Sequence, residues 1–340
     1  MTRRLAEVAR YAGVSEATVS RVLNQKPGVA KATQELVLTA LDVLGYERPT
    51  QLRGQRARLV GLVLPELQNP IFPAFAEVVA DALAKRGFTP VLCTRTSAGI
   101  SESAYVDMLL EHQVSGVIFS GGLYAQASAD HEHYVRLRER GLPAVLVNAA
   151  YDDLGYPRIS VDDRSAVEQA FTHLSSLGHE RIGMVLGPAY HVPSGRKLAA
   201  FHELGGAPEL VERGTFSIEG GQAAGGRLLR KGATGVICGS DVIALGVVRA
   251  VRREGLDVPD DVSVVGFDDS LLMSCTDPPL TTVRQPIEPM GRSAVATLIS
   301  QIGGAPVSSE EILFEPELVV RGSTGPARVA RGLKAASGQT

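Results

Sequence analysis

The stretch 7-EVARYAGVSEATVSRVLNQKPGVAKAT-33 decides how the N-terminal part of this 340-residue chain folds. Apolar residues before Gly13 recur at helical spacing, which predicts a first helix over residues 5–11. Gly13 can adopt the positive φ of a tight interhelical turn. Ser15 is suited to cap a second helix, over residues 16–24, because its hydroxyl can accept from a free amide.

The second predicted helix has two different faces. Val19, Val22 and Leu23 follow i, i+3, i+4 spacing and are expected to point inward. A third helix, over residues 31–44, is expected to pack one apolar face against them, made of Leu36, Val37, Ala40, Leu41 and Leu44. The outer face of the second helix has short side chains, which let a backbone approach base edges in the DNA major groove. The pattern predicts a helix-turn-helix.

Three outer residues of this helix have side chains that can read bases. Arg21 suits a bidentate contact with guanine, Glu16 can accept from a cytosine amino group, and Ala17 can touch a thymine methyl. Thr and Ser hydroxyls nearby can reach phosphates. The alternative is a three-helix module that binds protein.

Charge is distributed unevenly along the chain. Residues 1–58 contain ten Lys or Arg and five Asp or Glu, whereas the remaining residues contain 24 and 32. A basic head on an acidic body indicates that only the head meets a polyanion. Chance clustering is the alternative, so charge supports the motif without deciding it.

The segment "LAEVARYAGVSEATVSRVLN…GVAKATQELVLTALDVLGYERP" resembles the DNA-binding head of lactose-repressor-type (LacI family) transcriptional regulators. The resemblance implies that Glu16, Ala17 and Arg21 read bases. It also implies phosphate contacts from four further residues, Thr18, Ser20, Asn24 and Thr33. Leu5 and Ser15 complete the predicted DNA-binding set of the head. Ala30 departs from the family, which usually has Ser there as a helix cap and phosphate contact.

The linker, residues 48–58, is about three residues shorter than is usual in that family. In the family a linker leucine wedges into the minor groove and bends the operator, and Leu52 takes that position here. Arg53, with Arg48 and Arg56, can bind phosphates. The alternative is a flexible basic linker with an unremarkable leucine.

The body, residues 59–324, alternates short apolar runs with amphipathic helical segments. This alternation predicts an α/β fold of two doubly wound parallel-sheet subdomains. We expect one subdomain over residues 59–157 and 286–324 and the other over 158–285. A strand is expected at "GTFS", residues 214–217, and a single last strand at "ILFEPELVVRGS", residues 312–323. The landmarks "QNPIF", "GFDD", "PPLTTVRQP" and "ELVVRGST" resemble the LacI family, whose body has the fold of periplasmic sugar-binding proteins.

Ligands of open α/β sheets bind at strand carboxyl ends, so the polar residues that follow the predicted strands are the candidates for a pocket. Phe72 and Phe216 could stack on a ring, and Asp268 and Asn148 could each bind a pair of hydroxyls. The resemblance implies a clamping cation, which is Lys197 by register or Arg196 by chemistry. Each residue could instead be a structural strand-end cap. The full predicted effector-binding set is Asn69, Phe72, Asn148, Arg196, Lys197, Phe216, Ser240, Asp241, Asp268 and Gln285.

Other patterns bear on class and location. No apolar run reaches the ~20 residues of a membrane span, and no signal-peptide core is seen, so we expect a cytoplasmic protein. Neither a phosphate loop nor a nucleophile elbow is present, so we expect no enzyme. We expect no cofactor and no metal, with His131 and His133 on the surface and three cysteines as buried thiols, Cys93, Cys238 and Cys275.

The resemblance implies a homodimeric transcriptional regulator, expected to be a repressor, in which two heads read a near-palindromic DNA operator. A small-molecule effector, expected to be a sugar, would bind between the subdomains. The alternatives are a cytoplasmic sugar-binding protein without regulatory DNA binding, a transport component, and an α/β enzyme. The head is expected over residues 1–47, and the tail, residues 325–340, is expected to be disordered.

Overall fold

The computed structural model describes residues 2–24, 26–44, 46, 58–95, 99–148 and 154–327. The chain divides into two compact units, Met1–Leu59 and Val60–Thr340. Leu52 and Arg53, and with them the predicted wedge and linker contacts, lie outside the described residues.

The described part of the first unit contains three helices, α1 (Thr2–Ala12), α2 (Glu16–Leu23) and α3 (Lys31–Val43). Val8, Val19 and Val37 are buried where the three helices meet. The predicted inward face of α3 is wrong at Leu36, whose side chain is 56% exposed. Leu38 packs in the core instead, because the buried face of α3 lies on the other side of Val37.

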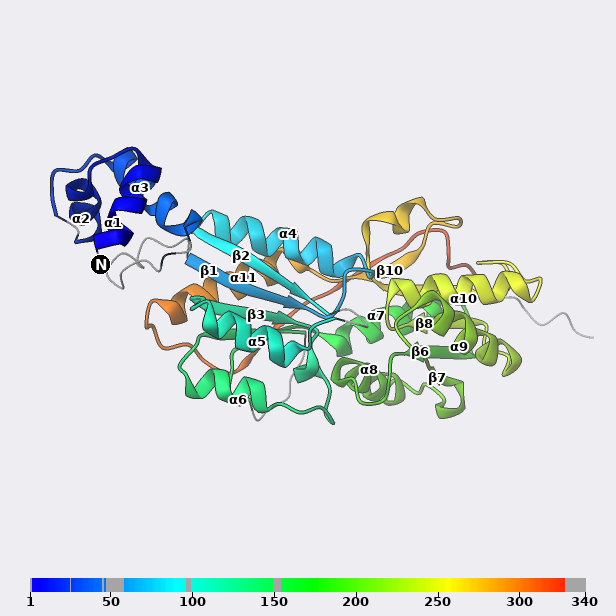
Figure 1. Cartoon of the computed structure of the whole chain (residues 1–340). Coiled ribbons are helices and arrows are strands. Elements are labelled where there is room, and N and C mark those ends of the chain that lie inside the picture. Colours follow the sequence, from blue (N-terminus) through cyan, green and yellow to red (C-terminus); the bar gives the residue numbers. More distant parts are fainter. Residues whose placement is uncertain are drawn as a thin grey trace, which may run out of the picture. The chain divides into compact units, whose positions relative to one another are not determined.

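The second unit contains two lobes, each with a six-stranded sheet (Figure 1). The sheet of the first lobe has the order β11-β5-β4-β3-β1-β2, and the described pairings in it are parallel. Its strands are β1 (Arg58–Leu64), β2 (Phe88–Thr94), β3 (Gly116–Ser120), β4 (Ala144–Val147), β5 (Arg158–Val161) and β11 (Glu311–Phe314). Its helices are α4 (Ile71–Ala84), α5 (Glu102–Glu111), η2 (Leu123–Ala125), α6 (Glu132–Glu139) and α11 (Ile287–Ile302).

The sheet of the second lobe has the order β12-β10-β9-β8-β6-β7. Only the β10–β12 pair is antiparallel among its described pairings. Its strands are β6 (Ile182–Leu186), β7 (Val211–Arg213), β8 (Gly235–Cys238), β9 (Ser263–Asp268), β10 (Thr281–Arg284) and β12 (Glu317–Val319). Its helices are α7 (Asp163–Ser176), α8 (Val192–Glu203), η4 (Pro208–Leu210), α9 (Ile218–Arg230), α10 (Asp241–Arg253) and η5 (Leu271–Cys275).

Both faces of each sheet are covered by helices, as near-continuously apolar parallel strands require. In the first lobe α4 and α11 pack together, and in the second α9 and α10 pack together, as do α7 and α8 (Figure 1). The fold class is therefore the predicted one. None of the helices in the described part of the chain is long and apolar enough to cross a membrane.

The subdomain boundaries differ from the expected ones. β5 pairs with β4 and β11, so residues 158–161 belong to the first lobe rather than the second. The predicted single last strand is two strands, with β11 in the first sheet and β12 in the second. Pro316 separates them, because proline has no amide to continue the ladder. The chain thus passes between the lobes near residues 162, 286 and 316.

Local differences have simple causes. Residues 214–217 form a loop that ends in the N-cap Ser217, and the strand there is β7. Residues 325–327 pack against the second lobe, where Gly325 donates its amide to Ser263 Oγ at 3.0 Å, so the predicted disorder is wrong for these three residues; the rest of the predicted tail lies outside the described residues. Cys275 is exposed, in contrast to Cys93 and Cys238.

His133 is buried, although we expected it on the surface. It lies beside the buried carboxylate of Glu102, with His133 Nε2 and Glu102 Oε1 3.2 Å apart. Tyr134 also donates its hydroxyl to Glu102. The polar residues around His133 therefore did not indicate that it is exposed. It is buried because the buried carboxylate of Glu102 is a partner for it.

Candidate functional site

The turn before α2 holds this helix in a fixed position against α1. Gly13 has a φ of 65°, which only glycine adopts readily, and Val14 donates its amide to Ala9 O at 3.0 Å. Ser15 caps α2, with its Oγ accepting from Thr18 N at 3.1 Å and lying 2.9 Å from Thr18 Oγ1. The predicted cap is therefore present.

The outward face of α2 is polar and open. Glu16, Ala17 and Arg21 are exposed, and their i, i+1, i+5 spacing places them on one side of the helix. Asn24 extends this side and donates its Nδ2 to Ser20 O at 2.8 Å. The remaining predicted head residues are exposed or half-buried, namely Leu5, Ser15, Thr18, Ser20 and Thr33.

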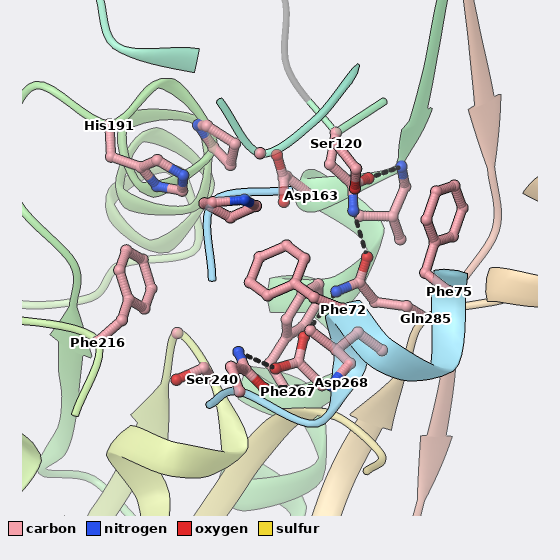
Figure 2. A pocket seen from close by; sticks show the side chains of 18 of the residues that line it. Phe72, Phe75, Ser120, Asp163, His191, Phe216, Ser240, Phe267, Asp268 and Gln285 are labelled. Atoms are coloured by element: carbon pink, nitrogen blue, oxygen red, sulfur yellow. Dashed lines mark hydrogen bonds between the residues drawn. The ribbon is translucent and has the colours of Figure 1, made fainter. Parts of the chain in front are cut away.

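The second unit contains a cavity of about 210 Å³ between its lobes (Figure 2). It lies at the carboxyl ends of strands from both sheets, where the sequence predicted it. Eight of the ten predicted residues line it: Asn69, Phe72, Asn148, Lys197, Phe216, Ser240, Asp268 and Gln285. Arg196 and Asp241 are not among the lining residues.

Two phenylalanine rings form walls of the cavity, one from each lobe (Figure 2). Each ring lies on a glycine. A Cβ on Gly187 would come within 2.2 Å of the Phe216 ring, and one on Gly121 within 3.1 Å of the Phe72 ring. His191 meets Phe216 edge to face, with ring centroids 5.1 Å apart. These faces suit stacking on a flat apolar surface.

Four polar side chains form a hydrogen-bonded chain across the cavity floor (Figure 2). Asn148 donates Nδ2 to Gln285 Oε1 at 2.7 Å, and Gln285 donates Nε2 to Asp268 Oδ1 at 2.6 Å. Asn69 lies at the other end, with its Nδ2 3.4 Å from Asp268 Oδ2. Because Asp268 ends β9 and Asn69 precedes α4, the chain joins the two lobes.

Backbone conformation turns two of these side chains into the cavity. Asn148 has a φ of 61° and Asp268 a φ of 123°, values that non-glycine residues adopt rarely. Such strain is maintained only where the surrounding structure fixes it, and it is common at ligand sites. Both residues are therefore held in place before any ligand arrives.

Burial raises the pKa of Asp268 well above its usual value, and the nearby carboxylate of Asp241 adds to this shift. Hydrogen bonds from Gln285 and Asn69 act in the opposite direction. The folded protein therefore binds a proton at Asp268 over a pH range in which the unfolded chain has released it.

This shift predicts that the free energy of unfolding falls as pH rises from about 4 through the raised pKa of Asp268, by up to about 1.4 kcal/mol per pH unit. Asp268→Asn removes the titrating group and should flatten that slope. Urea unfolding of both proteins between pH 5 and 8 measures it. An identical slope in the variant would contradict the assignment.

Of the two candidate cations, Lys197 is the one that lines the cavity. It donates from Nζ to Asp163 and lies 3.9 Å from the centroid of the Phe267 ring. Burial raises the pKa of Asp163, and Lys197 opposes that shift. Arg196 points elsewhere, because successive helical residues are about 100° apart, and its predicted place in the pocket is wrong.

Arg196 instead joins the lobes outside the cavity. Its two terminal nitrogens donate to the two carboxylate oxygens of Glu311 at 2.9 Å each, from α8 to β11. A backbone bridge between Gln126 and His191 makes a second contact between the lobes, and Ala127 N donates to Tyr190 O at 3.0 Å beside it.

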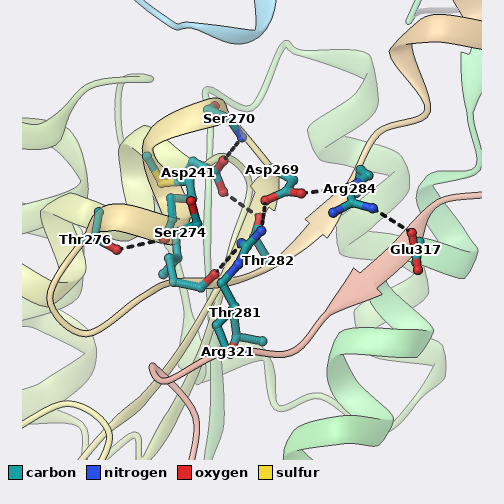
Figure 3. Close-up of polar contacts among 12 residues, drawn as sticks. Asp241, Asp269, Ser270, Ser274, Thr276, Thr281, Thr282, Arg284, Glu317 and Arg321 are labelled. Carbon is teal, nitrogen blue, oxygen red and sulfur yellow. Dashed lines mark hydrogen bonds and ion pairs between the residues drawn. The ribbon is translucent and has the colours of Figure 1, made fainter.

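Asp241 is a structural residue rather than a lining one (Figure 3). Its carboxylate accepts from Thr282 Oγ1 at 2.6 Å and from Ser270 N at 2.7 Å. Asp241, at the start of α10, thereby ties this helix both to the loop that follows β9 and to strand β10. Beside it, Asp269 receives ion pairs from Arg284 and Arg321, each at 2.7 Å (Figure 3).

Several lining residues were not predicted. Ser120 is the last residue of β3, just as Asn148 directly follows β4. The rule that polar residues at strand ends line the pocket could therefore have predicted Ser120. Asp163 is the first residue of α7, directly after the point near residue 162 where the chain passes from the first lobe to the second. Tyr190 and His191 belong to an irregular loop, in which nothing in the sequence marks the inward side chains. The other polar lining residues are Glu66, Gln126 and Ser160.

Most of the polar lining groups are paired within the protein. The side chains from Asn148 to Asn69 are hydrogen-bonded to one another, Lys197 is paired with Asp163, and His191 Nδ1 lies 2.9 Å from Ser194 Oγ. Burial, with Lys197 nearby, lowers the pKa of His191 to about 4. Over the described ranges, no three His, Cys, Asp or Glu side chains are grouped so as to hold a metal.

Comparison with known proteins gives a match for each unit of the chain. Residues 4–49 match the family model for bacterial regulatory proteins of the lacI family, and residues 171–324 match the periplasmic binding protein-like domain. The HTH-type transcriptional regulator reg1 of Streptomyces lividans is 54% identical over 343 residues, covering 98% of this chain and 99% of that protein.

Two solved structures are similar along nearly the whole chain. The transcriptional regulator CelR–cellobiose complex has a TM-score of 0.71 at 32% identity, covering 94% of this chain and 99% of that one. The Lac repressor dimer bound to operator and the anti-inducer ONPF has a TM-score of 0.73 at 29% identity, covering 94% and 98%. The chain therefore belongs to the LacI family and is a DNA-binding transcriptional regulator, not an enzyme.

Proposed function

We propose that this regulator is a homodimeric repressor whose DNA binding is controlled by a sugar in the cavity between its lobes. The observation that carries the proposal is the hydrogen-bonded chain from Asn148 to Asn69, which joins both lobes between two aromatic walls. Sugars present hydroxyls at their edges and apolar C–H faces, which match such a site. The similarity to the CelR–cellobiose complex supports the same ligand class.

Residues on α2 would read the operator. Arg21, Glu16 and Ala17 would contact bases, while the nearby hydroxyls and Asn24 would contact phosphates. Two heads related by a two-fold axis would read two halves of a near-palindrome. A chromosomal DNA partner would place the protein in the cytoplasm.

A surface of the second lobe supports a dimer. Leu271 and Leu272, in η5, are 86% and 60% exposed, an unusual position for adjacent large apolar side chains. The similarity to the Lac repressor dimer supports the same interpretation.

Coupling would follow from the connections between the lobes. A ligand that contacts both lobes favours one angle between them, since the chain passes between them near residues 162, 286 and 316. The linker to the head enters the first lobe at β1, so this angle would set the spacing of two heads in a dimer. The coupling is reciprocal, and DNA must alter sugar affinity by the same factor.

The test uses the purified full chain and labelled duplexes from its own upstream region, with a scrambled duplex as control. Fluorescence anisotropy should show preferred binding to one near-palindrome, weakening steeply with salt, and a change in affinity with one sugar of a mono- and disaccharide panel. Equal binding to the scrambled duplex would contradict operator recognition. An affinity that no sugar changes would contradict the proposed effector class.

The Arg196–Glu311 pair should favour the ligand-binding arrangement of the lobes. Arg196→Ala is expected to weaken sugar binding by about 1–2 kcal/mol, because a bidentate charged contact between the lobes is lost. Isothermal titration of the bound sugar measures the effect. Arg164→Ala is the matched control, since Arg164 pairs with Glu203 within the second lobe. Equal affinities in both variants would show that the pair plays no part in ligand binding.

A further inference from the structure

The cavity contains ionisable side chains of both signs, but its one cation is already paired. Among the described residues that line it, Lys197 is the only Lys or Arg. Its ammonium group donates to Asp163, and both side chains are buried.

The other ionisable groups of the lining offer an anion no further cationic partner. Asp268 and Glu66 add two carboxyl groups, and burial raises the pKa of each. His191 is neutral at pH 7, because its pKa is lowered to about 4. Arg196, the next cation along α8, is held by both oxygens of Glu311 and does not line the cavity.

We propose that the effector is an uncharged sugar and that phosphorylated and carboxylated sugars are excluded, because Lys197 is already paired and the described lining residues include no second cation. This inference rests on the proposed function and narrows its ligand class. Hydroxyl groups can donate and accept, so they suit the amides of Asn69, Asn148 and Gln285. A phosphate carries about −1.5 to −2 charges, and burying it without a cationic partner is costly.

The first experiment compares matched pairs of ligands on the wild-type dimer. Titration calorimetry is performed with glucose, maltose and cellobiose and with their 6- or 6′-phosphates. At least one neutral sugar should bind, and its phosphate should bind at least tenfold more weakly. A phosphate that binds as tightly as its neutral partner would overturn the inference and leave a sugar effector in place. Binding by no sugar of either kind would contradict the proposed effector class as well.

The second experiment adds one positive charge to the cavity in two ways. Asp163→Asn frees the ammonium group of Lys197, and Gln126→Lys places a new cation on a half-buried lining residue. Glu203→Gln makes the same change in net charge on the outer part of α8, away from the cavity.

Inorganic phosphate serves as a probe that does not depend on the identity of the sugar. Thermal unfolding with 0 and 20 mM phosphate, at constant ionic strength, should show stabilisation of Asp163→Asn and Gln126→Lys but not of the wild type or Glu203→Gln. Stabilisation of the wild type equal to that of the two variants would contradict the inference. The inference would also be contradicted if phosphate stabilised neither folded variant, because Gln126→Lys leaves the buried Lys197–Asp163 pair intact.

Discussion

Arg21→Ala should remove most of the preference of this regulator for its operator while leaving salt-sensitive binding to any duplex. The side chain is exposed on the outer face of α2, where a guanidinium group can reach guanine O6 and N7 together. Such a bidentate contact contributes about 1–3 kcal/mol of base discrimination. Anisotropy titrations with the operator and a scrambled duplex, each at several salt concentrations, give both the preference and the salt dependence.

Arg10→Ala is the matched control for this experiment. Arg10 is also exposed in the head but lies in the last turn of α1, outside the predicted base-reading set. Its loss removes the same charge, so any reduction in binding should be similar for the two duplexes. If Arg21→Ala and Arg10→Ala left the same operator preference, Arg21 would not read bases.

Asp268→Ala should weaken sugar binding on the order of 100-fold. The carboxyl group is buried at the centre of the polar chain, and its removal leaves the donor groups of Gln285 and Asn69 without their acceptor. Loss of a hydrogen bond to the ligand and of these internal partners together amounts to about 3 kcal/mol. Titration calorimetry with the bound sugar measures the loss, and circular dichroism shows whether the fold is retained.

Asp241→Asn separates binding from stability at a neighbouring carboxyl group. Asp241 is as buried as Asp268 but holds the loop after β9 to Thr282 rather than facing the cavity. This variant should lower the free energy of unfolding and leave the sugar affinity of the folded protein close to that of the wild type. A loss of affinity as large as that of Asp268→Ala would mean that the loop, and not the carboxyl group, controls binding.

The architecture and much of the cavity could be predicted from sequence because strand ends are easy to locate. Parallel strands place their carboxyl ends at one edge of the sheet, so Ser240 and Asp268, at the ends of β8 and β9, had to lie near one another, while Asn148 lies at the corresponding edge of the other sheet. The direction of each side chain could not be predicted in the same way. Asp241 follows Ser240 directly, yet only Ser240 lines the cavity, and Lys197 and Arg196 differ in the same manner.

Features that depend on contacts between residues far apart along the chain could not be predicted from the sequence. His133 lies in a polar run and is buried because Glu102, from another helix, is beside it. The stretch "ILFEPELVVRGS" was expected to form a single strand, but its two halves, in β11 and β12, pair with different sheets. Tyr190 and His191 face the cavity only because their loop meets Gln126 and Ala127 of the other lobe.

The assignment of β11 to the first sheet has a consequence for the nascent chain. Helices α1, α2 and α3 come from residues 2–43, whereas the first lobe lacks its edge strand until residues 311–314 have left the ribosome. At roughly 5–20 residues per second, these two events are separated by on the order of tens of seconds during synthesis. The DNA-binding head therefore emerges well before the effector-binding body can be completed. A chain truncated before residue 311 would contain the whole head but a first lobe without its edge strand β11.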